Sequence, residues 1–141
     1  IFHAPRNDLR WLRANFGLEV VNLFDTAAAA RELELASALE SGPGSGSCAA
    51  AANLQAGLKT LCREHLGTEL DKTYQQSDWR LRPLPAEMLR YAASDSRVLL
   101  PLARRLAGLL LDCGRLEKCQ EACRAAAGAN SRARRIRVEL I

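Results

Sequence analysis

The sequence has no long uninterrupted hydrophobic run. Its best candidate, Val98 to Cys113, is broken by Arg104 and Arg105, and a membrane-spanning helix needs ~18 to 20 consecutive apolar residues. We therefore expect no membrane association. The composition is not extreme either, since 48% of the residues are hydrophobic and 26% are charged. These proportions are typical of globular proteins and exclude disordered, collagen-like and coiled-coil chains.

Cysteine and histidine lack the spacings of a metal site. The five cysteines are an odd number and include no Cys-x-x-Cys pair, so neither a disulfide framework nor a zinc ribbon is indicated. His3 and His65 lie far apart and share no ligand spacing, so we expect core or surface roles for them. The cysteines are expected to stay reduced. The net charge of +4 is compatible with an anionic partner without demonstrating one.

Strand and helix patterns alternate in the N-terminal part of the chain. Residues 2–4 are predicted to form the end of a buried strand. A helix with apolar residues at helical spacing follows, and Asn7 or Asp8 can cap its start while Gly17 ends it. Residues 18–24 then form a second apolar run that is rich in strand-forming residues.

Asp25 follows this second run and is predicted to cap a helix over residues 27–39. We assign Asp25 this capping role and no catalytic one. The resulting order of strand, helix, strand and helix predicts an α/β fold, in which helices cover the faces of a sheet.

The middle of the chain contains a low-complexity segment. Residues 41–52, which include SGPGSGS, cannot form a packed element and are predicted to be a surface loop. A helix that ends near Gly67 follows, and a long helix is predicted from Ala86 onward, with a bend at Pro101. A last helix is predicted over residues 115–127.

The spacing of Tyr91 and Asp95 is the most informative feature of the long helix. Residues four apart lie one turn apart on the same face, so a phenol and a carboxylate can point into one cleft and hold a metal ion and a water. The alternative is a half-buried core tyrosine beside a solvated aspartate. Asp8 is a second candidate, because it follows a strand end, where α/β proteins commonly bind ligands. Its alternative role is helix capping.

An extended motif links these candidates. The segment SDWRLRPLPAEMLRYA at residues 77–92, followed by Asp95, resembles ribonuclease D and its eukaryotic relative, the exosome-associated nuclear 3′-5′ exoribonuclease. Upstream segments resemble the same family in the same order: FH at 2–3 with Asp8, WL at 11–12, FG at 16–17 and NLFDT at 22–26. The resemblance covers roughly residues 1–100. The motif RPLP-x-EML-x-YA is more similar to the nuclear exosome branch of the family than to bacterial ribonuclease D.

The resemblance implies a fold and a division of the chain. The expected fold is α/β, a partial ribonuclease H-like (DnaQ-like) 3′-5′ exonuclease domain that is mostly helical here because its early strands are absent. Residues 1–112 are expected to form the C-terminal part of this domain, with the loop at 41–52 inserted in it. Residues 113–141 are expected to form a trailing helix and a basic tail.

In this family four carboxylates bind two divalent ions, and a tyrosine four residues ahead of the last carboxylate positions the attacking water. The resemblance implies that Asp8 and Asp95 are metal ligands and that Tyr91 is this tyrosine. Another subfamily has a histidine at the position of Arg90, so the tyrosine (DEDDy) subtype fits. Two ions ~3.5 to 4 Å apart stabilise the attacking and leaving oxygens of a phosphodiester. Carboxylate oxygens are suitable ligands for Mg²⁺ or Mn²⁺.

One family motif is missing from the sequence. The family has Asp-x-Glu on an early strand, but none of the six aspartates here is followed two residues later by glutamate. Glu32 and Glu34 lie on a predicted helix downstream of Asp8, and we do not accept them as substitutes. Because the chain starts at Ile1 within a strand-like run, we expect it to be a piece of a longer nuclease and to be inactive alone. A protein without the motif would be a pseudo-nuclease.

Trp79, Arg80, Arg82 and Lys72 are candidates for RNA binding, since aromatic rings and cations are what single-stranded RNA contacts use. The alternative is that Trp79 is buried in the core and that the arginines pair with nearby carboxylates or helix ends. The basic segment at 132–137 also has two interpretations. It could contact a nucleic acid or act as a nuclear localisation signal, or it could be a solvated tail.

The resemblance as a whole implies a 3′-5′ exoribonuclease that removes nucleotides from RNA 3′ ends by two-metal-ion phosphodiester hydrolysis, in RNA processing or decay. The expected partners are single-stranded RNA 3′ ends and exosome components. The expected location is the nucleus, with the cytoplasm or an organelle as alternatives. The alternative is a non-catalytic module that binds RNA or acts as a scaffold, with an affinity that falls steeply with salt. An Asp-x-Glu motif upstream of Ile1 would distinguish the two.

Overall fold

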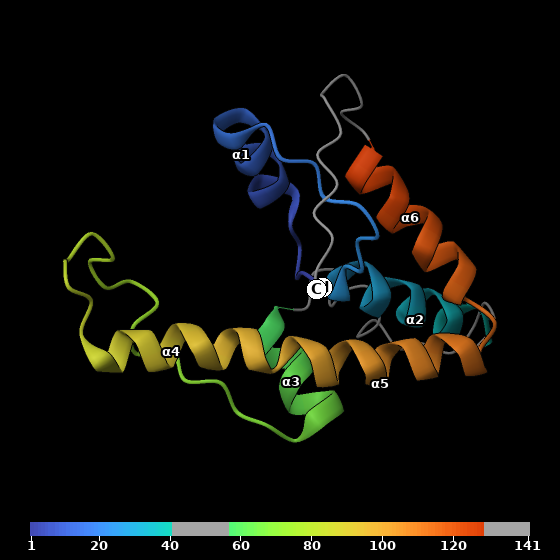
Figure 1. Cartoon of the computed structure of the whole chain (residues 1–141). Coiled ribbons are helices and arrows are strands. Elements are labelled where there is room, and N and C mark those ends of the chain that lie inside the picture. The colour runs from blue at the N-terminus through green and yellow to red at the C-terminus, as the bar shows by residue number, and fades with distance from the viewer. Residues whose placement is uncertain (41–56, 129–141) are drawn as a thin grey trace.

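The structure is a computed structural model that describes residues 1–40 and 57–128 (Figure 1). The described residues form α1 (Arg6–Phe16), α2 (Thr26–Glu40), α3 (Leu58–Leu66), α4 (Ala86–Arg97), α5 (Leu99–Asp112) and α6 (Leu116–Gly128). None of these helices is long and apolar enough to cross a membrane. The predicted loop at 41–52 and the basic segment at 132–137 lie outside the described residues.

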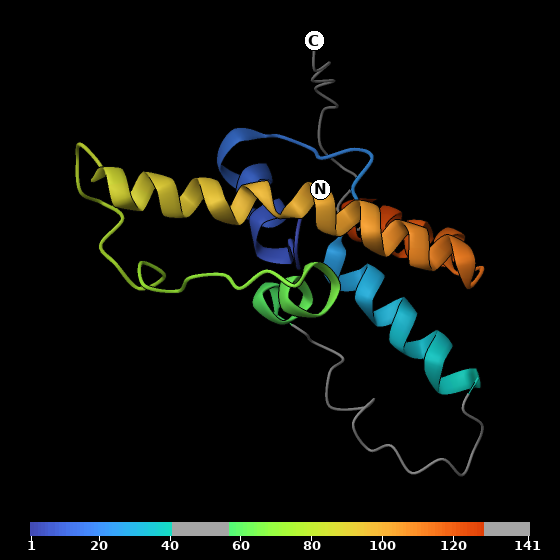
Figure 2. The same ribbon diagram turned by 90° about the horizontal axis from the view of Figure 1, so that it is seen from below.

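Helix α5 lies at the centre of the core. Leu102, Leu106 and Leu110 recur every fourth residue along it and are each 0% exposed, so one face of the helix is fully buried. Helices α2, α3 and α6 pack against α5, as Figures 1 and 2 show. They contribute mostly small residues to the core: Ala28, Ala29, Ala30, Leu61, Cys62, Cys119 and Cys123. Small side chains allow α2 and α6 to approach α5 closely.

Helices α4 and α5 continue one another in nearly a straight line (Figures 1 and 2). Our prediction of a bend at Pro101 was wrong, because the helix is interrupted at Val98 and Pro101 lies in the first turn of α5. A proline is tolerated in a first turn, where its missing backbone N–H has no intrahelical partner to lose. The N-terminal half of α4 therefore extends away from the core.

Glycine and aspartate set the helix ends as predicted. Helices α1 and α3 end at Gly17 and Gly67, which adopt the left-handed conformation with φ of 64° and 63°. Asp25 caps α2, because its Oδ1 accepts hydrogen bonds from the backbone N–H of Ala27 at 3.0 Å and from that of Ala4 at 2.8 Å. The predicted capping role of Asp25 is confirmed.

The two predicted strands do not form in the described residues. Phe2 and Asp25 make a single parallel bridge, in which the N–H of Phe2 donates to the carbonyl of Phe24 at 2.9 Å. Positive φ values at Ala4 (49°) and Asn22 (55°) turn both segments out of the extended conformation next to this bridge. The segments predicted as strands at 2–4 and 18–24 are therefore irregular chain.

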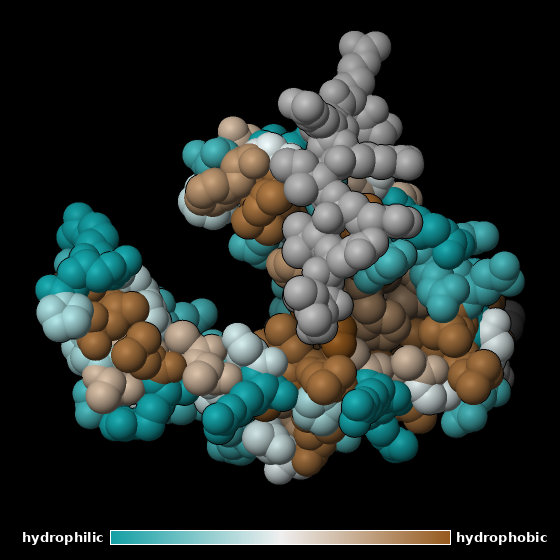
Figure 3. All heavy atoms as spheres, in the orientation of Figure 1, coloured by the Kyte–Doolittle hydropathy of each residue, from teal (hydrophilic) through white to brown (hydrophobic). Residues whose placement is uncertain are grey.

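Helix α1 stands apart from the core. Our prediction that Asn7 or Asp8 caps it was wrong, since the helix begins at Arg6 after Pro5 and has no side-chain cap hydrogen bond. None of its residues is buried, and Trp11 and Phe16 are 57% and 58% exposed. Figure 3 shows a hollow between α1 and the far end of α4. The two helices thus face each other across an open space.

The Asp25 cap gives a stability prediction. Asp25→Ala removes an acceptor of two backbone hydrogen bonds in a buried position, and should lower the free energy of unfolding by about 1 to 3 kcal/mol. Urea denaturation followed by circular dichroism measures the change. The exposed Asp112 is a matched control, and Asp112→Ala should change stability by less than about 0.5 kcal/mol. Equal effects of the two substitutions would contradict the capping role.

Candidate active site

Helix α4 brings Tyr91 and Asp95 together. The helix starts after Pro85, with Glu87 in its first turn, where a carboxylate interacts favourably with the helix dipole. Tyr91 and Asp95 lie one turn apart and both are half-buried, and the Asp95 carboxylate is close enough to raise the pKa of the tyrosine hydroxyl. The predicted phenol and carboxylate pair is therefore present on one helix face.

The charge of Asp95 acts on its neighbours. Burial first, and then the nearby Asp95 carboxylate, raise the pKa of the Tyr91 hydroxyl, and Asp71 makes a further contribution. Tyr91 is consequently a neutral phenol at physiological pH and can donate a hydrogen bond. Burial and then Asp95 also raise the pKa of the Cys62 thiol on α3. The Asp95 carboxylate thus lies within electrostatic reach of α3.

The irregular chain between α3 and α4, here called the 67–85 segment, covers the ring of Tyr91. The ring centroid of Tyr74 lies 6.0 Å from that of Tyr91 in an edge-on arrangement. The ring centroid of Trp79 lies 6.0 Å from that of Tyr91 with the planes tilted by 43°. Tyr74 and Trp79 are half-buried, so Trp79 packs against the candidate site from the 67–85 segment.

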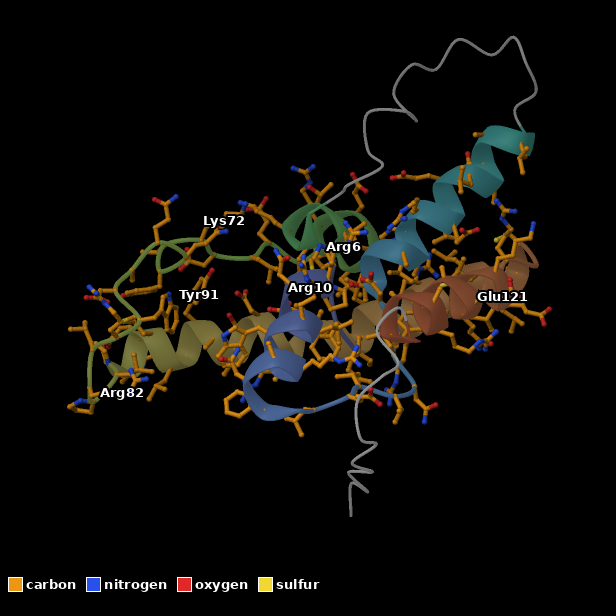
Figure 4. All side chains as sticks on the ribbon, turned by 90° about the horizontal axis from the view of Figure 1, so that it is seen from above. Arg6, Arg10, Lys72, Arg82, Tyr91 and Glu121 are labelled. Atoms are coloured by element: carbon orange, nitrogen blue, oxygen red, sulfur yellow. The ribbon has the colours of Figure 1, made fainter. Side chains whose placement is uncertain are left out.

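The basic side chains of the 67–85 segment differ in their surroundings. Arg80 forms an ion pair with Asp78, with 2.8 Å between Nε and Oδ1. Arg82 donates from Nη1 to the carbonyls of Trp79 at 3.0 Å and Leu81 at 2.6 Å. Lys72 is exposed. Figure 4 shows Lys72 and Arg82 on this segment with Tyr91 between it and α4.

Asp8 comes from a different element. It lies in the first turn of α1 and is exposed, on the helix that faces α4 across the hollow of Figure 3. The structure therefore pairs Tyr91 with Asp95 directly and places Asp8 on the facing helix.

The donor chemistry of Asp8 and Asp95 suits a divalent ion, since both side chains offer hard carboxylate oxygens. Within residues 1–40 and 57–128, no group of three or more histidine, cysteine, aspartate or glutamate side chains is arranged to hold a metal. The described part of the chain thus offers ligands of a suitable type for a divalent ion, but too few of them to complete a site.

The sequence did not point to Tyr74 or Asp71 as neighbours of Tyr91. Both lie in irregular chain, and a contact between irregular chain and a helix leaves no periodic pattern to detect. Arg6 and Arg10 form a further exposed basic pair on α1 (Figure 4), which we did not single out from the sequence. Their i, i+4 spacing was the available signal.

A family model described as 3′-5′ exonuclease matches residues 1–110. The chain belongs to this family. Among individual proteins, exosome complex component 10 of the rat, Rattus norvegicus, is 42% identical over 106 residues, which cover 75% of this chain and 10% of that protein. Protein RRP6-like 2 of Arabidopsis thaliana is 37% identical over 100 residues, which cover 71% of this chain and 9% of that protein.

Solved structures of the family have the same fold. The catalytic core of RRP6 from Trypanosoma brucei matches 89% of this chain and 30% of its own, with a TM-score of 0.71 and 36% sequence identity. Ribonuclease D of Escherichia coli, described as an exoribonuclease involved in structured RNA processing, matches 91% of this chain and 30% of its own, with a TM-score of 0.72 and 27% identity. The predicted ribonuclease H-like exonuclease fold is confirmed.

These matches confirm the resemblance drawn from the sequence motifs. Exonucleases of the ribonuclease H-like fold generally depend on divalent metal ions. The chain spans only about a tenth of the length of the rat and Arabidopsis proteins it matches.

Proposed function

We propose that this chain works as part of a 3′-5′ exoribonuclease that removes nucleotides one at a time from RNA ends. The observation that carries the proposal is the placement of Tyr91 and Asp95 one turn apart on α4, both half-buried, across a hollow from the helix that carries Asp8 (Figure 3). This pair lies in a chain of the 3′-5′ exonuclease family.

Each of the three residues has a distinct role in this proposal. Asp8 and Asp95 would hold Mg²⁺ or Mn²⁺, whose positive charge, when bound, stabilises the attacking and leaving oxygens of the phosphodiester. The neutral Tyr91 hydroxyl, whose raised pKa keeps it protonated, would orient the attacking water through a hydrogen bond. The first two ligands of the family, Asp-x-Glu, have no match in the sequence and would come from another segment.

RNA binding is proposed for the exposed cations of the 67–85 segment. Lys72 is exposed and Arg82 bonds only backbone carbonyls among the contacts described, so both keep their positive charge available to a phosphate. Arg80 is a weaker candidate, because Asp78 already neutralises it. Trp79 packs on Tyr91, so a base could stack only on the part of its ring that this contact leaves open.

The proposed partners are single-stranded RNA 3′ ends and exosome components, and the proposed location is the nucleus. The support is the name of the similar rat and mouse proteins, exosome complex component 10. The basic segment at 132–137 is proposed as an additional RNA contact or nuclear address on its sequence alone.

A second candidate function is a non-catalytic module that keeps the fold and binds RNA or acts as a scaffold. The observation in its favour is the absence of Asp-x-Glu from the sequence. Such a module would bind RNA through basic groups, with an affinity that falls steeply as salt is added.

Degradation of a 5′-labelled single-stranded RNA in Mn²⁺ tests the proposal. We compare the 141-residue chain with the longest natural protein that contains it. The longer protein should produce a ladder of products that shorten one nucleotide at a time, and the 141-residue chain should produce none, since its ligand set is incomplete. An RNA blocked at its 3′ end is the control and should stay intact. Salt-dependent RNA binding without products from a folded longer protein would overturn the proposal in favour of the non-catalytic module.

A further inference from the structure

Tyr74 and Trp79 contact the ring of Tyr91, and neither of them is a proposed metal ligand. We infer that Tyr74 and Trp79 are positioning residues, which hold the ring of Tyr91 so that its hydroxyl meets Asp95. The inference rests on the proposed function, in which Tyr91 orients the attacking water. It assigns Trp79 to the support of Tyr91 and not to stacking on RNA bases.

The geometry of the three rings is that of stabilising aromatic pairs. The centroids of Tyr74 and Trp79 each lie 6.0 Å from that of Tyr91, at interplanar angles of 61° and 43°. Edge-on and tilted pairs at about 4.5 to 7 Å are the preferred arrangements of aromatic rings. Tyr91 is therefore in contact with two rings of the 67–85 segment at once.

Helix α4 gives Tyr91 little other support. Met88 is its one buried residue, because the N-terminal half of the helix extends beyond the core (Figures 1 and 2). A tyrosine ring in such a place would be free to change its χ1 rotamer. Contacts from the 67–85 segment are what restrict it.

Hydrogen bonds hold the 67–85 segment in shape around both rings. On the Tyr74 side, Asp71 Oδ1 accepts from the N–H of Thr73 at 2.8 Å. The N–H of Ser77 donates to the carbonyl of Tyr74 at 3.1 Å. On the other side, the guanidinium of Arg82 donates to the carbonyl of Trp79 at 3.0 Å. The backbone at each ring is thus fixed by its own contact.

A fixed ring matters for the proposed chemistry. The Tyr91 hydroxyl has to keep its distance to Asp95 and to a water at the same time, and a misplacement of about 1 Å costs about 100-fold in rate. A ring of Trp79 that packs on Tyr91 also has less surface left for a base. Support of Tyr91 therefore explains the arrangement better than RNA stacking.

The chain contains two tyrosines and two tryptophans, so each ring can be followed separately. Fluorotyrosine labelling gives one ¹⁹F signal for each tyrosine, and Tyr74→Phe identifies the signal of Tyr91. The change of a ¹⁹F shift between H2O and D2O reports how far the ring is exposed to solvent. Trp79→Leu should expose and free the ring of Tyr91, so its signal should narrow and its solvent shift should grow. Trp11→Leu is the matched control, since Trp11 is 57% exposed on α1, and should leave the Tyr91 signal unchanged.

An unchanged line width and solvent shift of the Tyr91 signal in Trp79→Leu, at unchanged helix content by circular dichroism, would overturn the inference. This measurement needs no catalytic activity, so it can be read even if the proposed function fails. In an active longer protein, Trp79→Leu should lower kcat about 10- to 100-fold at unchanged KM for RNA, and Trp79→Phe, which keeps a ring, should recover most of it. A raised KM at unchanged kcat would assign Trp79 to RNA binding and would also overturn the inference.

Discussion

Asp95→Asn is expected to lower the rate of RNA degradation by the longer protein at least about 100-fold. The substitution keeps the size of the side chain and an oxygen that can accept from Tyr91, but it removes the negative charge that a divalent ion requires. Residues that only support metal ligands are worth about 10- to 100-fold in activity, so the loss of a ligand should exceed that range. The rate of product formation from 5′-labelled RNA in Mn²⁺ measures the effect.

The control for Asp95→Asn is Asp112→Asn, which removes one exposed carboxylate from the end of α5 and should leave the rate unchanged. RNA affinity at fixed salt should also be the same in both variants, because the proposed phosphate contacts lie on the 67–85 segment. The loss of the Asp95 charge should lower the pKa of Tyr91, since that charge is one of the causes that raise it. A rate within a fewfold of the unsubstituted protein would remove Asp95 from the catalytic site.

Leu106→Ala is expected to lower the free energy of unfolding by about 2 to 5 kcal/mol. Leu106 is 0% exposed at the middle of the buried face of α5, and it belongs to the core cluster to which α2, α3 and α6 also contribute. The truncation removes buried apolar surface and leaves a cavity that neighbouring helices can close only in part. A domain typically has a free energy of unfolding of about 5 to 15 kcal/mol, so the substitution should remove a large part of it.

Leu111 gives the control for this experiment. It lies on the same helix and is 66% exposed, so Leu111→Ala should change stability by less than about 0.5 kcal/mol. Urea denaturation followed by circular dichroism compares the two variants. Similar losses in both would show that the buried face of α5 is not the centre of the core.

The helices could be predicted because their signals are local. Gly17 and Gly67 end α1 and α3 through a left-handed conformation that glycine adopts without strain, and Asp25 caps α2 from the adjacent position. The predicted strands failed because pairing is not local. Phe2 bridges to Asp25, and a ladder needs partner strands that a window of a few residues cannot reveal.

One part of the candidate site could be predicted from local sequence, and the other part could not. Tyr91 and Asp95 could be predicted as a pair, because the helix repeat alone puts them on one face. The contacts of Tyr74 and Trp79 with Tyr91 could not, since they depend on how the 67–85 segment folds back over α4. The capping role proposed for Asp8 was wrong because α1 begins two residues earlier, at Arg6.

A change of metal preference tests the role of Asp95 most directly. In Asp95→Cys, a soft thiolate replaces a hard carboxylate, so the site should lose Mg²⁺ and Mn²⁺ and favour thiophilic ions such as Cd²⁺. RNA degradation by the longer protein is measured in Mn²⁺ and in Cd²⁺, with the unsubstituted protein in both ions as the control. We predict that Asp95→Cys is inactive in Mn²⁺ and regains activity in Cd²⁺. Undiminished activity of Asp95→Cys in Mn²⁺ would contradict the assignment of Asp95 as a ligand of the catalytic metal.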